Sequence, residues 1–161
     1  MGPEQLDFRR VAGLFATGVT VVTTAQDATV RAMTANSFTT VSLDPLSVLV
    51  CVNRDAITHG ILAEVQAFCV NVLNADQEAL SRACARPDTP EAELQGVDYE
   101  LGSTGMPVLK GALAYFECEV ASSLEYGTHT IFIGHVVNFG ESEGEPLLFY
   151  RGRYALLAEP K

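Results

Sequence analysis

The sequence contains no tryptophan and is short of basic residues. Ten lysines and arginines stand against twenty aspartates and glutamates among its 161 residues, so the formal net charge at pH 7 is -10. Nucleic acids and anionic membranes are bound by surfaces of the opposite balance, because lysine and arginine neutralise their phosphates. We therefore expect no nucleic-acid partner and no membrane partner.

Long apolar runs are absent, and so is a secretory signal. The longest apolar stretch, residues 47–52, is far shorter than the roughly 18 residues of a membrane-spanning helix. The first five residues combine neither a basic region nor an apolar one. At 48% hydrophobic residues the chain can bury one core, and it is too short for two. We predict a single cytoplasmic domain over residues 1–161.

Cysteine pairs and standard catalytic motifs are also missing. The cysteines form no C-x-x-C pair and have no zinc-like spacing with the histidines, so we expect reduced, buried thiols and no metal. The cysteines are at positions 51, 69, 84 and 118, and the histidines at 59, 129 and 135. The motifs G-x-S-x-G, H-E-x-x-H, G-x-G-x-x-G and the P-loop do not occur. A nucleophile–base pair of Cys51 and His59 is conceivable, but nothing in the sequence supports it.

Apolar periodicity predicts a mainly β fold of about seven strands with three helices between them. Expected helices cover 3–18, 55–65 and 76–85, and expected strands lie within 19–24, 30–41, 47–52, 67–73, 112–120, 130–139, 147–150 and 154–157. The first helix has apolar residues at 8, 11, 12 and 15, the pattern of one buried face. Because the strands do not alternate with long helices, we predict an antiparallel barrel and not a doubly wound sheet. Residues 86–107 lack periodicity and form a long excursion.

Small and amide-bearing residues interrupt the apolar pattern at Met33, Thr34, Ala35, Asn36, Ser37 and Phe38. Small side chains let backbone N–H groups approach a flat ligand, and Asn36 and Ser37 add donors and acceptors that suit an imide-like ring edge. A β-bulge or a strand end would explain the same residues. Two further segments could bind. Residues 51–54, with Thr58 and His59 near a helix start, form either an anion site or an ordinary loop. The second segment is the turn at Gly127, which presents the imidazole of His129 at the start of a strand.

Taken together, these segments resemble the flavin reductase-like family, whose fold is the FMN-binding split barrel. The resemblance runs in order from Phe8 to Tyr154, through residues 15–24, 34–45, 68–73, 111–114, 131–134 and 150–154. It implies a mainly β, antiparallel Greek-key split β-barrel with a few short helices. It also implies a homodimer that binds FMN or FAD without a covalent bond and reduces it with NADH or NADPH. In this reading a separate flavin-dependent monooxygenase receives the reduced flavin.

The resemblance also assigns site residues. The ring would be lined by Met33, Thr34, Ala35, Asn36, Ser37 and Ser42, and the ribityl chain and phosphate by Cys51, Val52, Asn53, Thr58 and His59. Cys84, Ala85 and Arg86 would touch the flavin after the third helix, and Arg153 and Tyr154 would close the site. His129 would lie at the nicotinamide side, where Gly127-Thr128-His129 replaces the family's Gly-Asp-His. Arg54, Arg86 and Arg153 are local positive charges for phosphates.

One departure from the family pattern keeps other functions open, because Thr128 removes a carboxylate that could orient the imidazole. Ala32, where the family usually has glycine, is a mild change. One alternative is a non-catalytic split-barrel protein that binds flavin or haem. Another is a flavin-dependent enzyme that acts directly on a small organic substrate.

Overall fold

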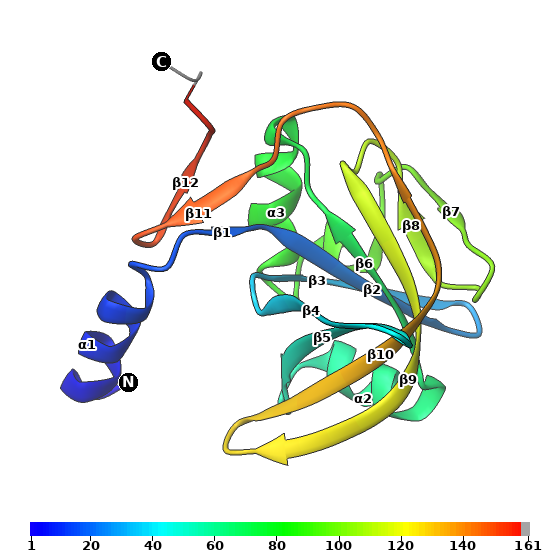
Figure 1. The fold of residues 1–161 in the computed structure, drawn as a ribbon, viewed down its shortest axis with the longest axis horizontal. Coiled ribbons are helices and arrows are strands. Elements are labelled where there is room, and N and C mark those ends of the chain that lie inside the picture. The colour runs from blue at the N-terminus through cyan, green and yellow to red at the C-terminus, as the bar shows by residue number, and fades with distance from the viewer. Residues whose placement is uncertain (159–161) are drawn as a thin grey trace.

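The computed structural model describes residues 1–158 and is mainly β, as predicted (Figure 1). Within these residues, seven strands form one antiparallel sheet in the order β3-β2-β6-β9-β10-β5-β4. Its strands are β2 (Thr20–Gln26), β3 (Thr29–Ala35), β4 (Phe38–Leu43), β5 (Leu46–Asn53), β6 (Ala67–Val72), β9 (Ala114–Tyr126) and β10 (His129–Glu141). Smaller sheets pair β1 (Thr17–Gly18), β11 (Leu148–Tyr150) and β12 (Arg153–Ala155), and β7 (Tyr99–Leu101) with β8 (Pro107–Leu109).

Short helices fill the connections. They are α1 (Pro3–Ala12), α2 (Ile57–Val65), α3 (Glu78–Cys84) and the 3₁₀ turns η1 (Ala75–Gln77) and η2 (Pro90–Glu93). In Figure 1, α1 projects away from the sheet at the N-terminal end. No helix within residues 1–158 is long and apolar enough to cross a membrane.

The two edge strands of the large sheet are joined by only two residues. β3 ends at Ala35 on one edge, β4 begins at Phe38 on the other, and Asn36 and Ser37 lie between them. Three Cα-to-Cα steps span at most about 11 Å, so the two edges must come close together. The sheet therefore curls into an open barrel, and we call Asn36 and Ser37 the seam.

The main core lies inside this curl. Val48, Val50 and Val52 alternate along β5 and are almost fully buried, as the period of two requires. They belong to one cluster with Phe68, Phe132 and the α2 residue Leu62. This packing fixes β5 and the start of α2, and both reach the seam region.

A buried carboxylate holds the turn before β8. Glu117 on β9 is 1% exposed and accepts hydrogen bonds from the Thr104 N–H and hydroxyl (both 3.0 Å), the Ser103 hydroxyl (3.2 Å) and the Asn138 amide (2.6 Å). A Cβ at position 102 would overlap this carboxylate, so the close approach requires Gly102. The glycine-containing turn at residues 102–105 is thus packed against a charged group.

Several boundaries differ from the predictions. The first helix ends at Ala12, because the chain turns at Gly13 into β1. The residues of the predicted buried face are exposed: Phe8 and Val11 on the helix and Phe15 after it are 72%, 54% and 80% exposed. Periodicity identifies an apolar face but not what covers it. The cap of α2 is Ala56 without a side-chain hydrogen bond, so neither Asp55 nor Thr58 caps the helix.

The third helix and the excursion also differ from the predictions. Asn74 caps η1 with a capping box, and α3 begins only at Glu78, so Asp76 is not its cap. The excursion 86–107 contains η2, β7 and the start of β8.

Candidate functional site

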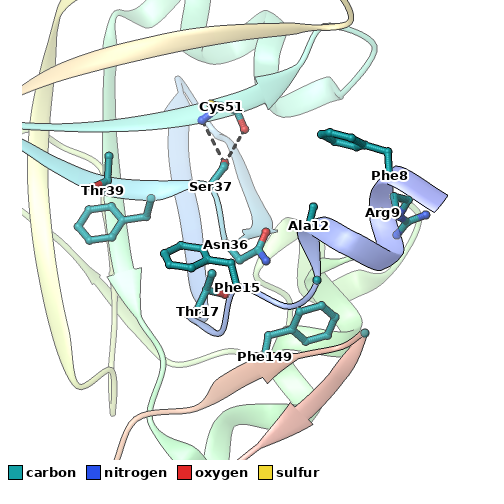
Figure 2. A pocket seen from close by; sticks show the side chains of 13 residues that line it. Phe8, Arg9, Ala12, Phe15, Thr17, Asn36, Ser37, Thr39, Cys51 and Phe149 are labelled. Atoms are coloured by element: carbon teal, nitrogen blue, oxygen red, sulfur yellow. Dashed lines mark hydrogen bonds between the residues drawn. The ribbon is translucent and has the colours of Figure 1, made fainter. Parts of the chain in front are cut away.

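A pocket with a volume of about 610 Å³ opens beside the seam. It lies within the roughly 300–1,000 Å³ range typical of cofactor sites. Figure 2 shows Asn36 pointing from the seam toward α1, with the rings of Phe15 and Phe149 nearby. The walls of the pocket come from α1, β1, the seam, β4, β5 and β11. We call it the seam pocket.

Ser37 ties the seam to β5. Its hydroxyl donates to the Cys51 carbonyl (2.9 Å) and accepts from the Cys51 N–H (3.1 Å), as the dashed lines in Figure 2 mark. One small side chain thus satisfies both the N–H and the carbonyl of Cys51. These two groups lie on the side of β5 that is away from β10. The bond pair holds the seam backbone in place without filling the pocket, since serine is short.

A second pocket of about 370 Å³ lies farther back along β3 and is lined by Met33, Thr58, Cys84, Arg31 and others. The start of α2 forms part of its wall, and this helix has no side-chain cap, so no side chain occupies its N-terminal end. Arg31 pairs with Glu93 at 2.7 Å. A helix N-terminus beside an arginine favours an anion. We call this the α2 pocket.

A smaller hollow of about 160 Å³ lies between the first two and is lined by Thr34, Ala35, Asn36 and Tyr154. Thr34 donates to the Ser81 carbonyl (2.7 Å), and the Tyr154 hydroxyl bonds the Ser81 hydroxyl (2.7 Å). These contacts attach β3 and β12 to α3. Residues 33–37 therefore line three adjoining hollows, at the position where the sequence predicted close approach of a flat ligand.

Two unsatisfied atoms point to a ligand in these hollows. Among residues 1–158, Thr17 Oγ1 and Arg31 Nε are buried side-chain atoms without a hydrogen-bond partner. Thr17 lines the seam pocket and Arg31 the α2 pocket. Such groups cost free energy when unpaired. Thr17 therefore brings an unpaired hydroxyl to the wall of the seam pocket, and Arg31, which is also paired with Glu93, brings an unpaired Nε to the wall of the α2 pocket.

Five other predicted site residues lie on β5, on β10 and at the end of α3. Asn53 pairs with His129 across β5 and β10, where the His129 Nδ1 bonds the Thr128 hydroxyl (2.8 Å). The Val52 side chain is fully buried in the core, so only its backbone is available. Ala85 is the C-cap of α3 and Arg86 follows it, beside the α2-pocket residue Pro87.

None of the three hollows beside the seam is lined by Ser42 or Arg153, nor by Val52, Asn53, His59, Ala85, Arg86 or His129. Ser42 lines a separate apolar hollow with Phe116 and Phe139, and it accepts the Asp44 N–H. Arg153 is exposed on β12 opposite Tyr150.

Cys51 and His59 do not form a nucleophile–base pair. His59 Nε2 bonds the Thr130 hydroxyl (2.8 Å), and its ring packs against Phe132 with centroids 5.5 Å apart. Burial raises the pKa of the Cys51 thiol above its ordinary value, which disfavours the thiolate. The pocket therefore offers no activated nucleophile, and its chemistry must come from a ligand.

Sequence reasoning missed several lining residues. Phe8 and Phe15 were expected in a buried helix face, and Thr17, Arg31 and Phe149 were not singled out. The aromatic residues at helical spacing carried a signal, but their exposure depends on how α1 leaves the sheet. Thr17 and Arg31 are single polar residues among many, and only their unpaired atoms distinguish them.

Cys51 offers a direct probe of the seam pocket. It is the only half-buried cysteine among the described residues, whereas burial raises the pKa of Cys84 to about 11 and of Cys118 to about 12. We expect N-ethylmaleimide at neutral pH to label Cys51 first, and saturating FMN to slow that labelling at least several-fold. Mass spectrometry of tryptic peptides over time measures both. Equal rates with and without FMN would place the flavin elsewhere.

The chain is similar to known proteins over almost its whole length. Residues 12–158 match the model of the flavin reductase like domain. The chain is 39% identical over 153 residues to an FMN reductase (NADH), SmoA, of Agrobacterium fabrum, covering 95% of this chain and 86% of that protein. It is 37% identical over 151 residues to the reductase component of a 4-nitrophenol 4-monooxygenase/4-nitrocatechol 2-monooxygenase of Rhodococcus opacus, covering 94% and 80%.

A solved structure is also similar over nearly its whole length. It is the NADH:FAD oxidoreductase SgcE6 of Streptomyces globisporus in complex with NAD and FAD fragments, with a TM-score of 0.91 and 41% identity. The alignment covers 99% of this chain and 96% of that one.

Proposed function

This chain belongs to the flavin reductase like domain family, and from that premise we propose that it is an NADH- or NADPH-dependent flavin reductase. It reduces FMN or FAD and releases the product to a separate flavin-dependent monooxygenase. The proposal is supported by relatives named as an FMN reductase (NADH), as an NADH:FAD oxidoreductase and as the reductase component of a monooxygenase. The unit of function is one domain over residues 1–161.

The observation that carries the proposal is the seam. Two sheet edges meet there over two small polar residues, and the adjoining pockets contain two buried, unpaired polar atoms. The seam backbone with Asn36 and Thr17 holds the ring edge. The start of α2 and Arg31 hold the phosphate, although the chain as a whole is acidic. A bound flavin supplies the hydride acceptor, so NADH leaves as NAD⁺ and the flavin leaves reduced.

The protein's own part in this reaction is placement. No residue has to transfer a proton through a catalytic pair, which agrees with the absence of one beside Cys51. The seam pocket is wide and partly open, so a flavin held by hydrogen bonds and contacts alone can enter oxidised and leave reduced. This favours a diffusible flavin over a resident one.

The exposed face of α1 supports a homodimer. Leu6, Phe8 and Val11 on α1, and Leu14 and Phe15 just after it, are each about half exposed or more, and a surface this rich in exposed apolar side chains marks an interface. α1 also forms one wall of the seam pocket, so a second copy covering it would enclose the ring. Light scattering should give twice the 17.3 kDa chain mass. A mass of one chain at micromolar concentration would refute this part.

His129 is proposed to contact the nicotinamide. We expect His129→Ala to raise the KM for NADH about fivefold, because one exposed contact contributes about 1 kcal/mol, while kcat stays within about twofold. The matched control is His135→Ala, an exposed histidine on the same strand that lines no pocket described above. Unchanged kinetics in His129→Ala would remove this residue from the site.

Steady-state kinetics with the four pairs of NADH or NADPH and FMN or FAD test the proposal as a whole. Loss of the nicotinamide absorbance band in at least one pair is the expected result. Tight flavin binding without NADH or NADPH oxidation in any pair would contradict the proposal and favour the non-catalytic flavin-binding alternative.

A further inference from the structure

Three arginines gather in a hollow beside the seam pocket that none of the predicted site residues line. Arg9 and Arg10 come from the last turn of α1 and Arg151 from the turn between β11 and β12, and together with Leu14 and Gly152 they line about 580 Å³. The Arg151 N–H donates to the Gly13 carbonyl (2.9 Å), which holds the turn against the end of α1. We call this hollow the arginine pocket.

Its charge opposes that of the molecule. Residues 3–18 and 146–157, which form α1 and the β11–β12 hairpin, contain four arginines and only two acids, whereas the whole chain has twice as many acids as bases. One ion pair among the described residues touches the cluster, between Arg10 and Asp7 at 3.5 Å, and both side chains are more than 70% exposed. Such a pair is weak, so the cluster has positive charge available.

Arg151 sits in a backbone conformation that other residues would adopt more readily. Its φ is 51° and that of Gly152 is 74°, so both residues of this two-residue turn are left-handed. Such type I′ turns favour Asn-Gly or Gly-Gly. Arg9 and Arg10 also suit the C-terminal end of a helix, but that does not explain an arginine in the turn. The Arg151 guanidinium lies 5.3 Å from the centre of the Tyr150 ring, and Arg151 lines the same hollow as Arg9 and Arg10.

The arginine pocket continues the seam pocket. Arg9 and Gly152 line both hollows, so one ligand can extend from one to the other. In the proposed function the flavin phosphate lies in the α2 pocket, farther back along β3. The ligand that reaches the arginines is therefore the second one in the reaction.

We propose that the arginine pocket binds the diphosphate of the nicotinamide dinucleotide while its nicotinamide lies in the seam pocket. Guanidinium groups bind phosphate oxygens through paired, charge-assisted hydrogen bonds. The diphosphate of FAD has the same chemistry and is the competing occupant. The inference rests on the proposed function for the identity of the ligand, but binding at the arginines is measurable without turnover.

The test variant is Arg10→Gln combined with Arg151→Asn. Asparagine suits the left-handed turn, so folding is preserved. Lys110→Gln is the control, because Lys110 is exposed and does not line the arginine pocket. Calorimetry with ADP-ribose, which carries the diphosphate without the nicotinamide, should give a Kd raised about tenfold in the double variant and unchanged in the control. The KM for NADH should rise similarly, with kcat and the KM for FMN unchanged.

Two other outcomes would overturn the inference, and a third would separate it from the proposed function. Unchanged ADP-ribose binding would overturn the inference. A loss of affinity for FAD but not for ADP-ribose would also overturn it and assign the pocket to the flavin. Absence of NADH oxidation by the wild type together with weakened ADP-ribose binding in the variant would refute the proposed function and leave the arginine pocket as a nucleotide diphosphate site.

Discussion

Replacing Glu117 by glutamine should lower the free energy of unfolding by about 2–4 kcal/mol. The amide keeps the volume but turns one acceptor into a donor, and it then faces groups that themselves donate, on Thr104, Ser103 and Asn138. Urea unfolding measures the difference. Glu119→Gln, an exposed residue two positions along the same strand, should change stability by less than about 0.5 kcal/mol. Equal effects would mean that the buried network does not stabilise the fold.

The same carboxylate should make the fold sensitive to acid. Burial alone would raise the pKa of Glu117, but hydrogen bonds from Thr104, Asn138 and Ser103 outweigh it and hold the pKa below its ordinary value of 4.5. A folded pKa below the unfolded one contributes stability above pH 4.5, and this is lost as the pH falls through the folded pKa. The free energy of unfolding of Glu117→Gln should fall less steeply below pH 4.5 than that of the wild type. Parallel curves would contradict this assignment.

Ser37→Ala should lower kcat/KM for FMN at least tenfold. The variant leaves the Cys51 N–H and carbonyl without their partner, at a cost of about 1–3 kcal/mol, and frees the seam backbone that we propose meets the ring. Ser37→Thr keeps the hydroxyl and should retain most of the activity. Fluorescence titration of FMN separates weakened binding from slower chemistry. Wild-type values in Ser37→Ala would show that the seam does not position the flavin.

Much of the fold could be predicted from the sequence, because period-two apolar patterns are local. The strand expected at residues 47–52 is present within β5, and the antiparallel, mainly β fold is confirmed. The resemblance to flavin reductases rested on many short segments in order, and the family match confirms it.

The rest depended on contacts between distant residues. Glu117 alternates with apolar neighbours as a solvent-facing residue would, yet the turn at 102–105 covers it. The apolar spacing of α1 could not reveal that the helix leaves the sheet at Gly13 and exposes Phe8. Arg9 and Arg151 are 142 positions apart and meet only because the β11–β12 turn bonds the end of α1.

Anaerobic mixing of the protein with excess FMN and NADH tests the central claim most directly. Without oxygen, the account predicts that the visible absorbance of the free flavin bleaches over many turnovers while the nicotinamide band decays in equal molar amount. Ser37→Ala should bleach it at least tenfold more slowly at low FMN. The account would be contradicted if neither FMN nor FAD bleached faster with the protein than in buffer, with NADH or with NADPH as the reductant.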